Sequence, residues 1–237
     1  MNETVHTRLV LVRHGQSVWN RQHRLTGWSD VPLTAHGEKQ ARAAGRLLAA
    51  AGFAFDVAYT SMLRRASDSL DIVLQTMDSE AEVHRCWELN ERHYGALEGL
   101  GPIRGVLKFG FREVFACQRD FNIPPPAVAT DDPRYPANQA AYQGVPRDSL
   151  PRSEAMADAM ARMIPLWESG IAPAVQAGRR VLVVGHKNIL RGMVKQIGDH
   201  TPAEVERLAI RTGQAWVFEL DAQLRPLRQY ILGQTRA

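Results

Sequence analysis

Two histidines in the chain directly follow apolar runs. "LVLV" at residues 9–12 leads into Arg13, His14 and a glycine, and "VLVVG" at residues 181–185 leads into His186. Each run predicts a buried strand, so each histidine is expected at a strand end. The carboxyl ends of parallel strands share one edge of a sheet, and ligands bind beyond that edge. The two imidazoles are therefore predicted to belong to one site.

The chemistry of His14 has three candidate interpretations: it fills a turn, binds a metal or attacks a substrate. A metal site needs more ligands, and neither an HExxH pattern nor an Asp/His cluster accompanies His14, so no metal is expected. A nucleophile needs a neutral imidazole, cations that hold an anionic substrate and a proton donor for the leaving group. Residues of these types are available in Arg13, Arg65, His186 and Glu91. Arginine suits phosphate because its planar fork bonds two oxygens at once.

Each of these side chains, taken singly, also has a purely structural interpretation. Arg65 follows Arg64 on a predicted helix and could be a solvated charge. Glu91 could be a surface carboxylate paired with Arg92, and the dipeptide 26–27 could be a simple turn. The functional interpretation rests on their occurring together.

Strands alternate with helices along the chain. Strands are predicted at 8–12, 55–61, 82–86, within 179–188, at 214–221 and at 227–232; helices are predicted at 34–52, 62–77, 106–119, 154–168 (capped by Ser153), 189–198 and 202–208. This alternation is typical of an α/β fold, a three-layer α/β/α arrangement in which helices flank a mostly parallel central sheet of about six strands. We expect one domain over 1–237, with an irregular, proline-rich insertion at about 98–151 that is either functional or disordered.

Composition narrows the classes of ligand. The chain has 237 residues, 45% of them hydrophobic and 23% charged, with a net charge of +4 and a pI near 9.3. The basic excess fits either an arginine-rich solvated surface or an anionic ligand. Nucleic acid is not expected as a partner, because no dense Lys/Arg run, zinc-finger spacing or RNP-like pattern occurs.

Cysteine usage and hydropathy indicate a reducing, cytoplasmic location. Cys86 and Cys117 form neither a C-x-x-C pair nor a disulfide framework. The first residues lack the apolar region of a signal peptide, and no window reaches the ~18 apolar residues of a membrane span, so no membrane partner is expected.

Five segments together resemble the cofactor-dependent phosphoglycerate mutases of the histidine phosphatase superfamily. They read "LVRHGQSVWN", "RLTGWSDVPLTAHGEKQA", "YTSMLRRA", "LNERHYGALEGL" and "GHKNILRGMVK". The resemblance extends from about residue 8 to about residue 233 and implies a phosphoglycerate mutase-like fold. It also implies a homodimer or homotetramer and a small, anionic, phosphorylated substrate.

The resemblance implies a mechanism. His14 would be phosphorylated by 2,3-bisphosphoglycerate and would pass the phosphoryl group to 2- or 3-phosphoglycerate, with no metal. Arg13, Arg65 and His186 would surround the transferring group, and Glu91 would be the general acid and base. The implied substrate-binding residues are Ser17, Asn20, Thr26, Gly27, Arg92, Tyr94, Arg119, Lys187 and Asn188.

The chain departs from the family at the anion-binding rim. Pro102 stands where the family has a lysine, and Gln118 where it has the first of two adjacent arginines, the second being Arg119. Asp120 and Lys187 each replace a family glycine. Two cations are thus lost from this rim, and a carboxylate is added.

Two consequences of these departures are open. Lys187 and Arg104 could replace the lost charges. Alternatively, bisphosphate binding is weaker by a factor of about 10² to 10⁴, since each charged hydrogen bond contributes about 1.5–3 kcal/mol. The chain also stops soon after "YILGQTRA", where many relatives have a longer tail, so a more open site that admits water is expected.

The sequence therefore supports three hypotheses. The first is interconversion of 2- and 3-phosphoglycerate through phosphohistidine, an isomerase reaction of glycolysis and gluconeogenesis. The second is hydrolysis of phosphomonoesters with the same residues, and the third is a non-catalytic relative that keeps the fold. The complete set of candidate catalytic residues argues against the third.

Overall fold

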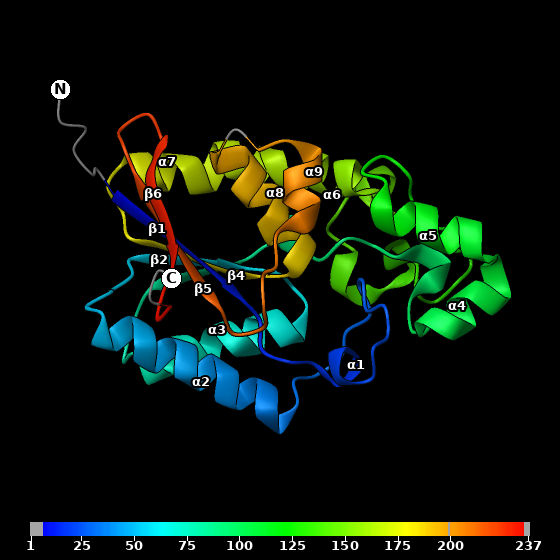
Figure 1. Ribbon diagram of the computed structural model, residues 1–237, viewed down its shortest axis with the longest axis horizontal. Coiled ribbons are helices and arrows are strands. Elements are labelled where there is room, and N and C mark those ends of the chain that lie inside the picture. Colours follow the sequence, from blue (N-terminus) through cyan, green and yellow to red (C-terminus); the bar gives the residue numbers. More distant parts are fainter. Residues whose placement is uncertain (1–6, 199, 235–237) are drawn as a thin grey trace.

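A six-stranded sheet forms the centre of the computed structural model, which describes residues 7–198 and 200–234 (Figure 1). The strands are β1 (Thr7–Arg13), β2 (Val57–Thr60), β3 (Glu82–Arg85), β4 (Val181–Gly185), β5 (Ala215–Leu220) and β6 (Pro226–Ile231). Their order is β3-β2-β4-β1-β5-β6. The first four are parallel, β5 is antiparallel to β1, and β6 is antiparallel to β5. The expected mostly parallel sheet is confirmed.

Helices cover both faces of the sheet. One face packs against α2 (Ala35–Ala50) and α3 (Arg64–Thr76), and the other against α6 (Met156–Leu166), α7 (Ala172–Gln176) and α8 (Lys187–Ile197) (Figure 1). Apolar side chains of β1 point alternately to the two faces of the sheet: Leu9 and Leu11 pack into one core, and Val10 and Val12 into the other. Both faces must therefore be buried under helices. The three-layer α/β/α arrangement predicted from the sequence is therefore correct. Among the described residues, no helix has the length and apolar character to cross a membrane.

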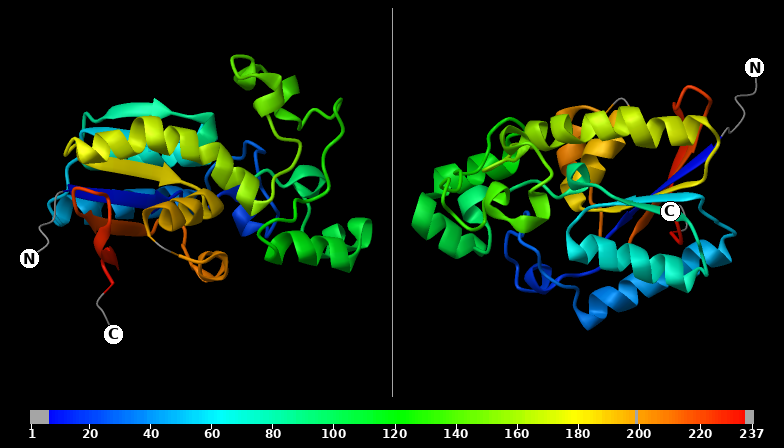
Figure 2. Two further views of the ribbon diagram at one scale, coloured as in Figure 1. Left: turned by 90° about the horizontal axis from the view of Figure 1, so that it is seen from above. Right: turned by 180° about the vertical axis from the view of Figure 1, so that it is seen from behind.

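Residues 98–151 form an excursion that lies beyond the carboxyl ends of the parallel strands (Figure 2). It contains α4 (Pro102–Phe109), α5 (Phe111–Arg119) and short 3-10 turns at 136–138, 140–142 and 147–149. The prediction of one helix at 106–119 is wrong, because Gly110 adopts φ +86° between α4 and α5. That backbone conformation cannot continue a right-handed helix.

Two other helix starts also differ from the prediction. Ser153 does not cap α6: the N-cap is Ala155, whose N–H donates to the Asp158 carboxylate at 2.8 Å. Helix α8 begins at Lys187, two residues earlier than predicted. Lys187 and Asn188 therefore lie in the first turn of α8, directly after the strand-end His186. Short helices α1 (Val18–Arg21) and α9 (Pro202–Arg207) complete the α-helices of the described residues, and a π-helical turn at Trp167–Ile171 joins α6 to α7.

Candidate active site

His14 follows the last residue of β1 and is held in one tautomer. Its Nδ1 lies 2.7 Å from the carbonyl oxygen of Gly15, which can only accept a hydrogen bond, so Nδ1 carries the proton. The ring is buried, and burial together with the charges of Arg65 and Arg13 holds the pKa of His14 well below its usual range. His14 is therefore neutral near pH 7, with Nε2 unprotonated and able to attack.

His186 lies beside His14 at the end of the neighbouring strand β4. The two ring centroids are 5.0 Å apart in an edge-to-face arrangement, as expected for histidines at adjacent strand ends. Nε2 of His186 is 2.7 Å from the hydroxyl of Ser61, and its Nδ1 is buried without a hydrogen-bond partner in the described part of the chain. Burial, with Arg65 and His14 nearby, also holds the pKa of His186 well below its usual range.

Two arginines next to the histidines supply positive charge. Arg65, in the first turn of α3, is fully buried and donates to the carbonyl oxygens of Ser29 and Gly27 at 3.0 and 2.7 Å. Burial lowers the pKa of Arg65 to about 10, which leaves it protonated at neutral pH. Arg13 donates through one terminal nitrogen to Ile210 at 2.7 Å, while its Nε is buried without a partner among the described residues. Both guanidinium groups are fixed in place before any ligand arrives.

Arg13, His14 and Arg65 line a hollow at the carboxyl edge of the sheet, here called the inner chamber; His186 contacts the His14 ring but does not itself line this hollow. It is lined by Arg13, His14, Asn20, Arg24, Leu25, Thr26, Gly27, Arg65, Glu91, Tyr94 and Lys187. Nine of these eleven residues were expected in the site from the sequence. One cavity is thus lined by residues from five parts of the chain: the end of β1, the segment between β1 and α2, helix α3, the segment after β3, and helix α8.

Glu91 is the carboxylate of this chamber. It is 8% exposed, and its Oε1 accepts hydrogen bonds from the backbone N–H groups of Arg92 at 2.9 Å and Asn188 at 3.3 Å. Glu91 is therefore a buried acid held by backbone donors from two elements, and the surface-pair interpretation of this residue is wrong.

A buried ion pair positions the segment that carries Glu91. Arg162, on α6, pairs with Glu154 at 2.6 Å and also donates to the carbonyl oxygens of Glu88 at 2.7 Å and Asn90 at 3.1 Å. Both partners are nearly inaccessible, with side chains 6% and 3% exposed. One guanidinium thus ties the backbone at 88–90 to helix α6.

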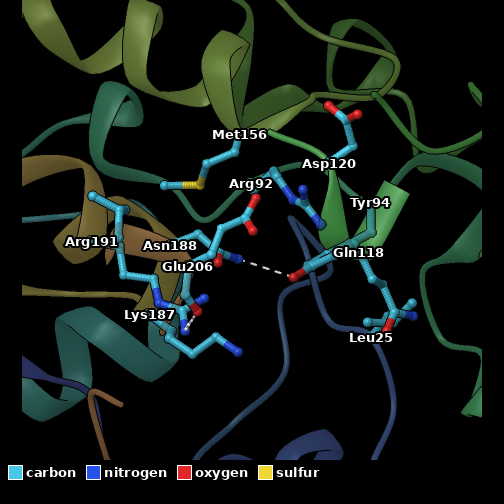
Figure 3. Close-up of a pocket in the computed structure, with 11 residues that line it drawn as sticks. Leu25, Arg92, Tyr94, Gln118, Asp120, Met156, Lys187, Asn188, Arg191 and Glu206 are labelled. Atoms are coloured by element: carbon cyan, nitrogen blue, oxygen red, sulfur yellow. Dashed lines mark hydrogen bonds between the residues drawn. The ribbon is translucent and has the colours of Figure 1, made fainter. Parts of the chain in front are cut away.

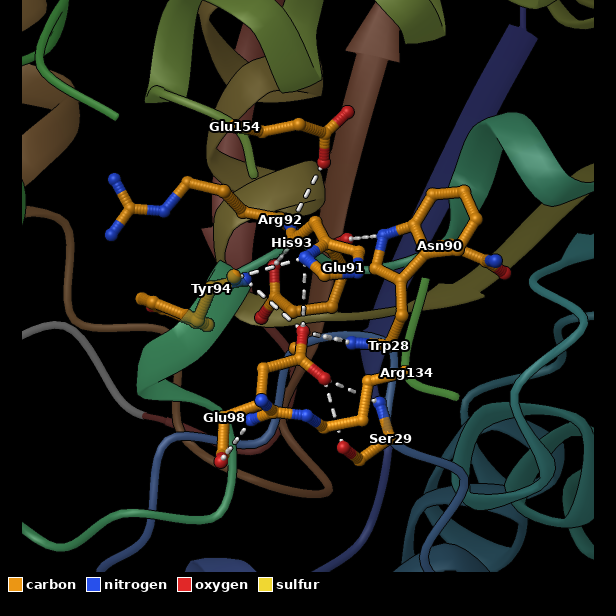
Figure 4. Close-up of polar contacts among 12 residues, drawn as sticks. Trp28, Ser29, Asn90, Glu91, Arg92, His93, Tyr94, Glu98, Arg134 and Glu154 are labelled. Carbon is orange, nitrogen blue, oxygen red and sulfur yellow. Dashed lines mark hydrogen bonds and ion pairs between the residues drawn. The ribbon is translucent and has the colours of Figure 1, made fainter. Parts of the chain in front are cut away.

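The Glu98 carboxylate positions the opposite wall (Figure 4). It accepts from the backbone N–H groups of Trp28 at 2.9 Å, Ser29 at 3.1 Å and Tyr94 at 3.1 Å. The loop that offers Gly27 to Arg65 is thereby joined to Tyr94, whose side chain lines the chamber.

A second hollow, here called the outer chamber, adjoins the first through Leu25, Tyr94 and Lys187, which line both (Figure 3). Its complete lining is Leu25, Arg92, Tyr94, Gln118, Asp120, Met156, Lys187, Asn188, Arg191, Val205 and Glu206. The Arg92 guanidinium lies 4.5 Å from the centre of the Tyr94 ring, and Asn188 donates to the Tyr94 hydroxyl at 3.0 Å. The outer chamber thus carries three cations and two carboxylates.

Two expected substrate-binding residues line neither chamber. Ser17 is buried and accepts the N–H of Asn20 as the N-cap of α1. Arg119 is exposed, with its guanidinium 4.5 Å from the ring centre of Phe115. The α5 surface of the outer chamber instead presents Gln118 and Asp120. Helical geometry explains this, because adjacent residues of a helix point in different directions.

The structure adds residues that were not expected from the sequence. Arg24 lines the inner chamber, Arg191 the outer one, and Ser61 holds His186. Ser61 could have been predicted from the sequence, because it directly follows β2 and so lies at the same edge of the sheet as both histidines. Within residues 7–198 and 200–234, no group of three or more His, Cys, Asp or Glu side chains is arranged to hold a metal ion.

Comparison with known families gives a match over most of the chain. The family described as the histidine phosphatase superfamily (branch 1) matches residues 9–109 and 122–230. The matched ranges include His14, Arg65, Glu91 and His186, and leave out residues 110–121, which contain all of α5.

Several solved structures share the fold. A mycobacterial glucosyl-3-phosphoglycerate phosphatase is 21% identical with a TM-score of 0.70, over 98% of this chain and 100% of that chain. A putative alpha-ribazole-5'-phosphate phosphatase from Escherichia coli is 24% identical with a TM-score of 0.71, over 96% of each chain. The Bacillus stearothermophilus protein YhfR is 24% identical with a TM-score of 0.65, over 91% and 92%. At these identities the likeness concerns the fold alone.

Proposed function

Because the chain belongs to the histidine phosphatase superfamily (branch 1), we propose that it transfers the phosphoryl group of a small phosphomonoester through a phosphohistidine at His14. The observation that carries this proposal is the neutral His14 ring, whose Nδ1 is bound to Gly15 and whose Nε2 is unprotonated. Arg13 and Arg65 stand beside it in the same chamber. A neutral nucleophile among fixed cations is what phosphoryl transfer requires of a protein.

The first half of the reaction follows from the inner chamber. Nε2 of His14 forms a bond to phosphorus while the bond from phosphorus to the ester oxygen breaks. Arg13 and Arg65, joined by the unpartnered Nδ1 of His186, stabilise the charge on the equatorial oxygens. Glu91 protonates the departing oxygen, and in the second half it takes the proton from the incoming hydroxyl.

The leading candidate for the whole reaction is interconversion of 2- and 3-phosphoglycerate. The mutase-like motifs support it, as does the pair of adjoining cationic chambers, which fits a ligand with two anionic groups. The same pair of chambers fits 2,3-bisphosphoglycerate, with Arg13 and Arg65 at one end and Arg92 and Lys187 at the other. When bound, the bisphosphate would supply the priming phosphoryl group.

Hydrolysis is the second candidate, and the α5 surface of the outer chamber favours it. Gln118 and Asp120 line this surface, so no cation there holds a second phosphate. A bisphosphate that leaves early would expose the phosphohistidine to water. The same residues would then act as a phosphomonoesterase.

A single experiment tests the proposal and separates the two candidates. Interconversion of the phosphoglycerates and release of inorganic phosphate are measured on one sample, with and without 2,3-bisphosphoglycerate. Mutase turnover that depends on the bisphosphate and exceeds phosphate release supports the first candidate. Phosphate release that exceeds mutase turnover supports the second. The absence of both activities in folded protein would exclude the phosphoglycerates as substrates, and the absence of phosphate release from a panel of other phosphomonoesters as well would contradict phosphoryl transfer altogether. The expected homodimer or homotetramer and the cytoplasmic location remain predictions, which sedimentation and cell fractionation would test.

A further inference from the structure

The cations of the outer chamber are not distributed evenly over its walls. Lys187 and Arg191 both lie on α8, whereas the α5 wall contributes Gln118 and Asp120. Arg119 is stacked on Phe115, away from the chamber. A ligand that enters the outer chamber therefore meets positive charge on the α8 side and a carboxylate on the α5 side.

The three cations of the outer chamber differ in how much of their bonding capacity is already used. Arg191 donates to the carbonyl oxygens of Glu206 at 2.6 Å and Leu208 at 2.7 Å. Arg92 donates to Cys117 at 3.2 Å and stacks on Tyr94. Over residues 7–198 and 200–234, the Lys187 ammonium has neither a hydrogen-bond nor an ion-pair partner. It is also the one of the three that lines both chambers.

Two further observations indicate that the chamber is built to receive an anion. Arg92 is 5% exposed, and its Nε is buried without a hydrogen-bond partner among the described residues. Burying an unpaired donor of a charged group is unfavourable, so an acceptor from a ligand would complete it. Lys187 is half-buried in a cationic neighbourhood, where burial and Arg191 lower its pKa from the usual lysine value. A bound anion would accept a hydrogen bond from Arg92 and would also stabilise the positive charge of Lys187.

From this arrangement we infer that Lys187 is the specificity-determining residue of the site: it binds a second anionic group of the substrate, close to the phosphoryl group that His14 receives. The inference rests on the proposed function and assigns its preference for a second anionic group to one residue. The substrate is a phosphomonoester with a carboxylate or second phosphate a few bonds away, and that group is held from the α8 wall. Asp120, on the opposite wall, disfavours a third anionic group.

Arg104 provides the matched control, because it is the other cation that the sequence offered as a replacement for the lost charges. Arg104 lines a different surface hollow, together with Pro102, Ile103 and Arg24, and it lines neither chamber. The expectation that Arg104 replaces the missing charges of the binding site is therefore wrong. Arg104→Met removes one positive charge from the same region of the protein without touching the chambers.

The test compares two ligands that differ in one group. 3-Phosphoglycerate and glycerol 3-phosphate share the phosphate and the adjacent hydroxyl, but the first ends in a carboxylate and the second in an alcohol. Their dissociation constants are measured by calorimetry in a His14→Ala background, which prevents turnover. We expect 3-phosphoglycerate to bind more tightly, and Lys187→Met to weaken it by about 10- to 100-fold with glycerol 3-phosphate nearly unchanged. Lys187→Arg should keep most of the preference, and Arg104→Met all of it.

Three results would overturn the inference: no preference for the carboxylate before substitution, an equal loss for both ligands in Lys187→Met, or a loss of preference in Arg104→Met. If Lys187→Met does not fold, the two ligands are compared in the protein before substitution and in Lys187→Arg. The inference then requires a preference for 3-phosphoglycerate in both proteins. Failure of the proposed function is a different result, since His14 would then accept no phosphoryl group from any phosphomonoester while ligand binding could persist.

Discussion

Nδ1 of His14 lies 2.7 Å from the carbonyl oxygen of Gly15, its neighbour in the chain. This short bond to an obligate acceptor determines which ring nitrogen is left to react. Attack by Nε2 further requires a neutral ring, because Nε2 must keep its lone pair. The ring is kept neutral by its environment, since burial and the charges of Arg65 and Arg13 lower the pKa of His14.

Acidification should destabilise the fold through the two buried histidines. Unfolded histidine titrates near pH 6.5, whereas burial keeps the folded pKa of His14 and His186 well below that value. Below about pH 6.5 the unfolded chain therefore binds protons that the folded chain does not, and the free energy of unfolding falls by up to about 1.4 kcal/mol per pH unit for each histidine. Urea denaturation at pH 7, 6 and 5 measures this slope. The His14→Gln/His186→Gln double variant should show a flatter one, and equal slopes would contradict the neutral-histidine account.

Removing Arg162 should destabilise the protein and lower its activity together. Arg162→Met leaves the Glu154 carboxylate buried without its cation, which costs about 3–5 kcal/mol. It also releases the backbone at 88–90 that leads into Glu91. Arg42→Met is the control, because its pair with Glu38 is exposed on α2 and should contribute about 0.3–0.5 kcal/mol. A similar denaturation midpoint for both variants would show that the buried pair does not hold this segment.

A methyl group at Gly27 should disturb the site more than one at Gly52, although both glycines have positive φ, +54° and +74°. A Cβ at Gly27 would collide with the Glu98 carboxylate, whereas nothing lies within 4 Å of one at Gly52. Gly52→Ala should therefore cost only the backbone term of about 1–2 kcal/mol, with normal turnover. Gly27→Ala should in addition lower kcat at least about tenfold, because it shifts the loop that binds Arg65. Equal kcat values in the two variants would contradict the positioning role of Glu98.

Some residues of the site are placed by local sequence and others only by tertiary packing. His14 and His186 were predictable because a strand end fixes where a residue lies in a parallel sheet. The direction of Arg119 was not predictable, because it depends on the break at Gly110 and on how α5 then packs against the site. Arg24 and Arg191 were missed for a related reason. Each lies in an ordinary loop or helix and reaches a chamber only through the tertiary arrangement.

Changing the α5 wall should strengthen binding of a second anion. Gln118→Arg combined with Asp120→Gly adds one positive charge to that wall and removes one negative charge, and we expect the KM for 3-phosphoglycerate to fall by about 10- to 100-fold. Mutase turnover should rise relative to phosphate release. Glu113→Arg makes the same change in net charge on an exposed part of the same helix, outside both chambers, and should change neither quantity. An equal effect of the control would mean that overall charge, and not the wall, decides affinity.

The most direct test of the account is mass spectrometry of the intact protein after brief incubation with 2,3-bisphosphoglycerate, followed by peptide mapping at a pH that preserves phosphohistidine. The account predicts one acid-labile phosphoryl group, located on His14 and absent from His14→Ala, while a control His36→Gln variant at an exposed position is labelled normally. The lifetime of the adduct without acceptor would then separate mutase from hydrolase. Turnover of a phosphomonoester with no adduct at His14, or with the label on another residue, would contradict the central claim.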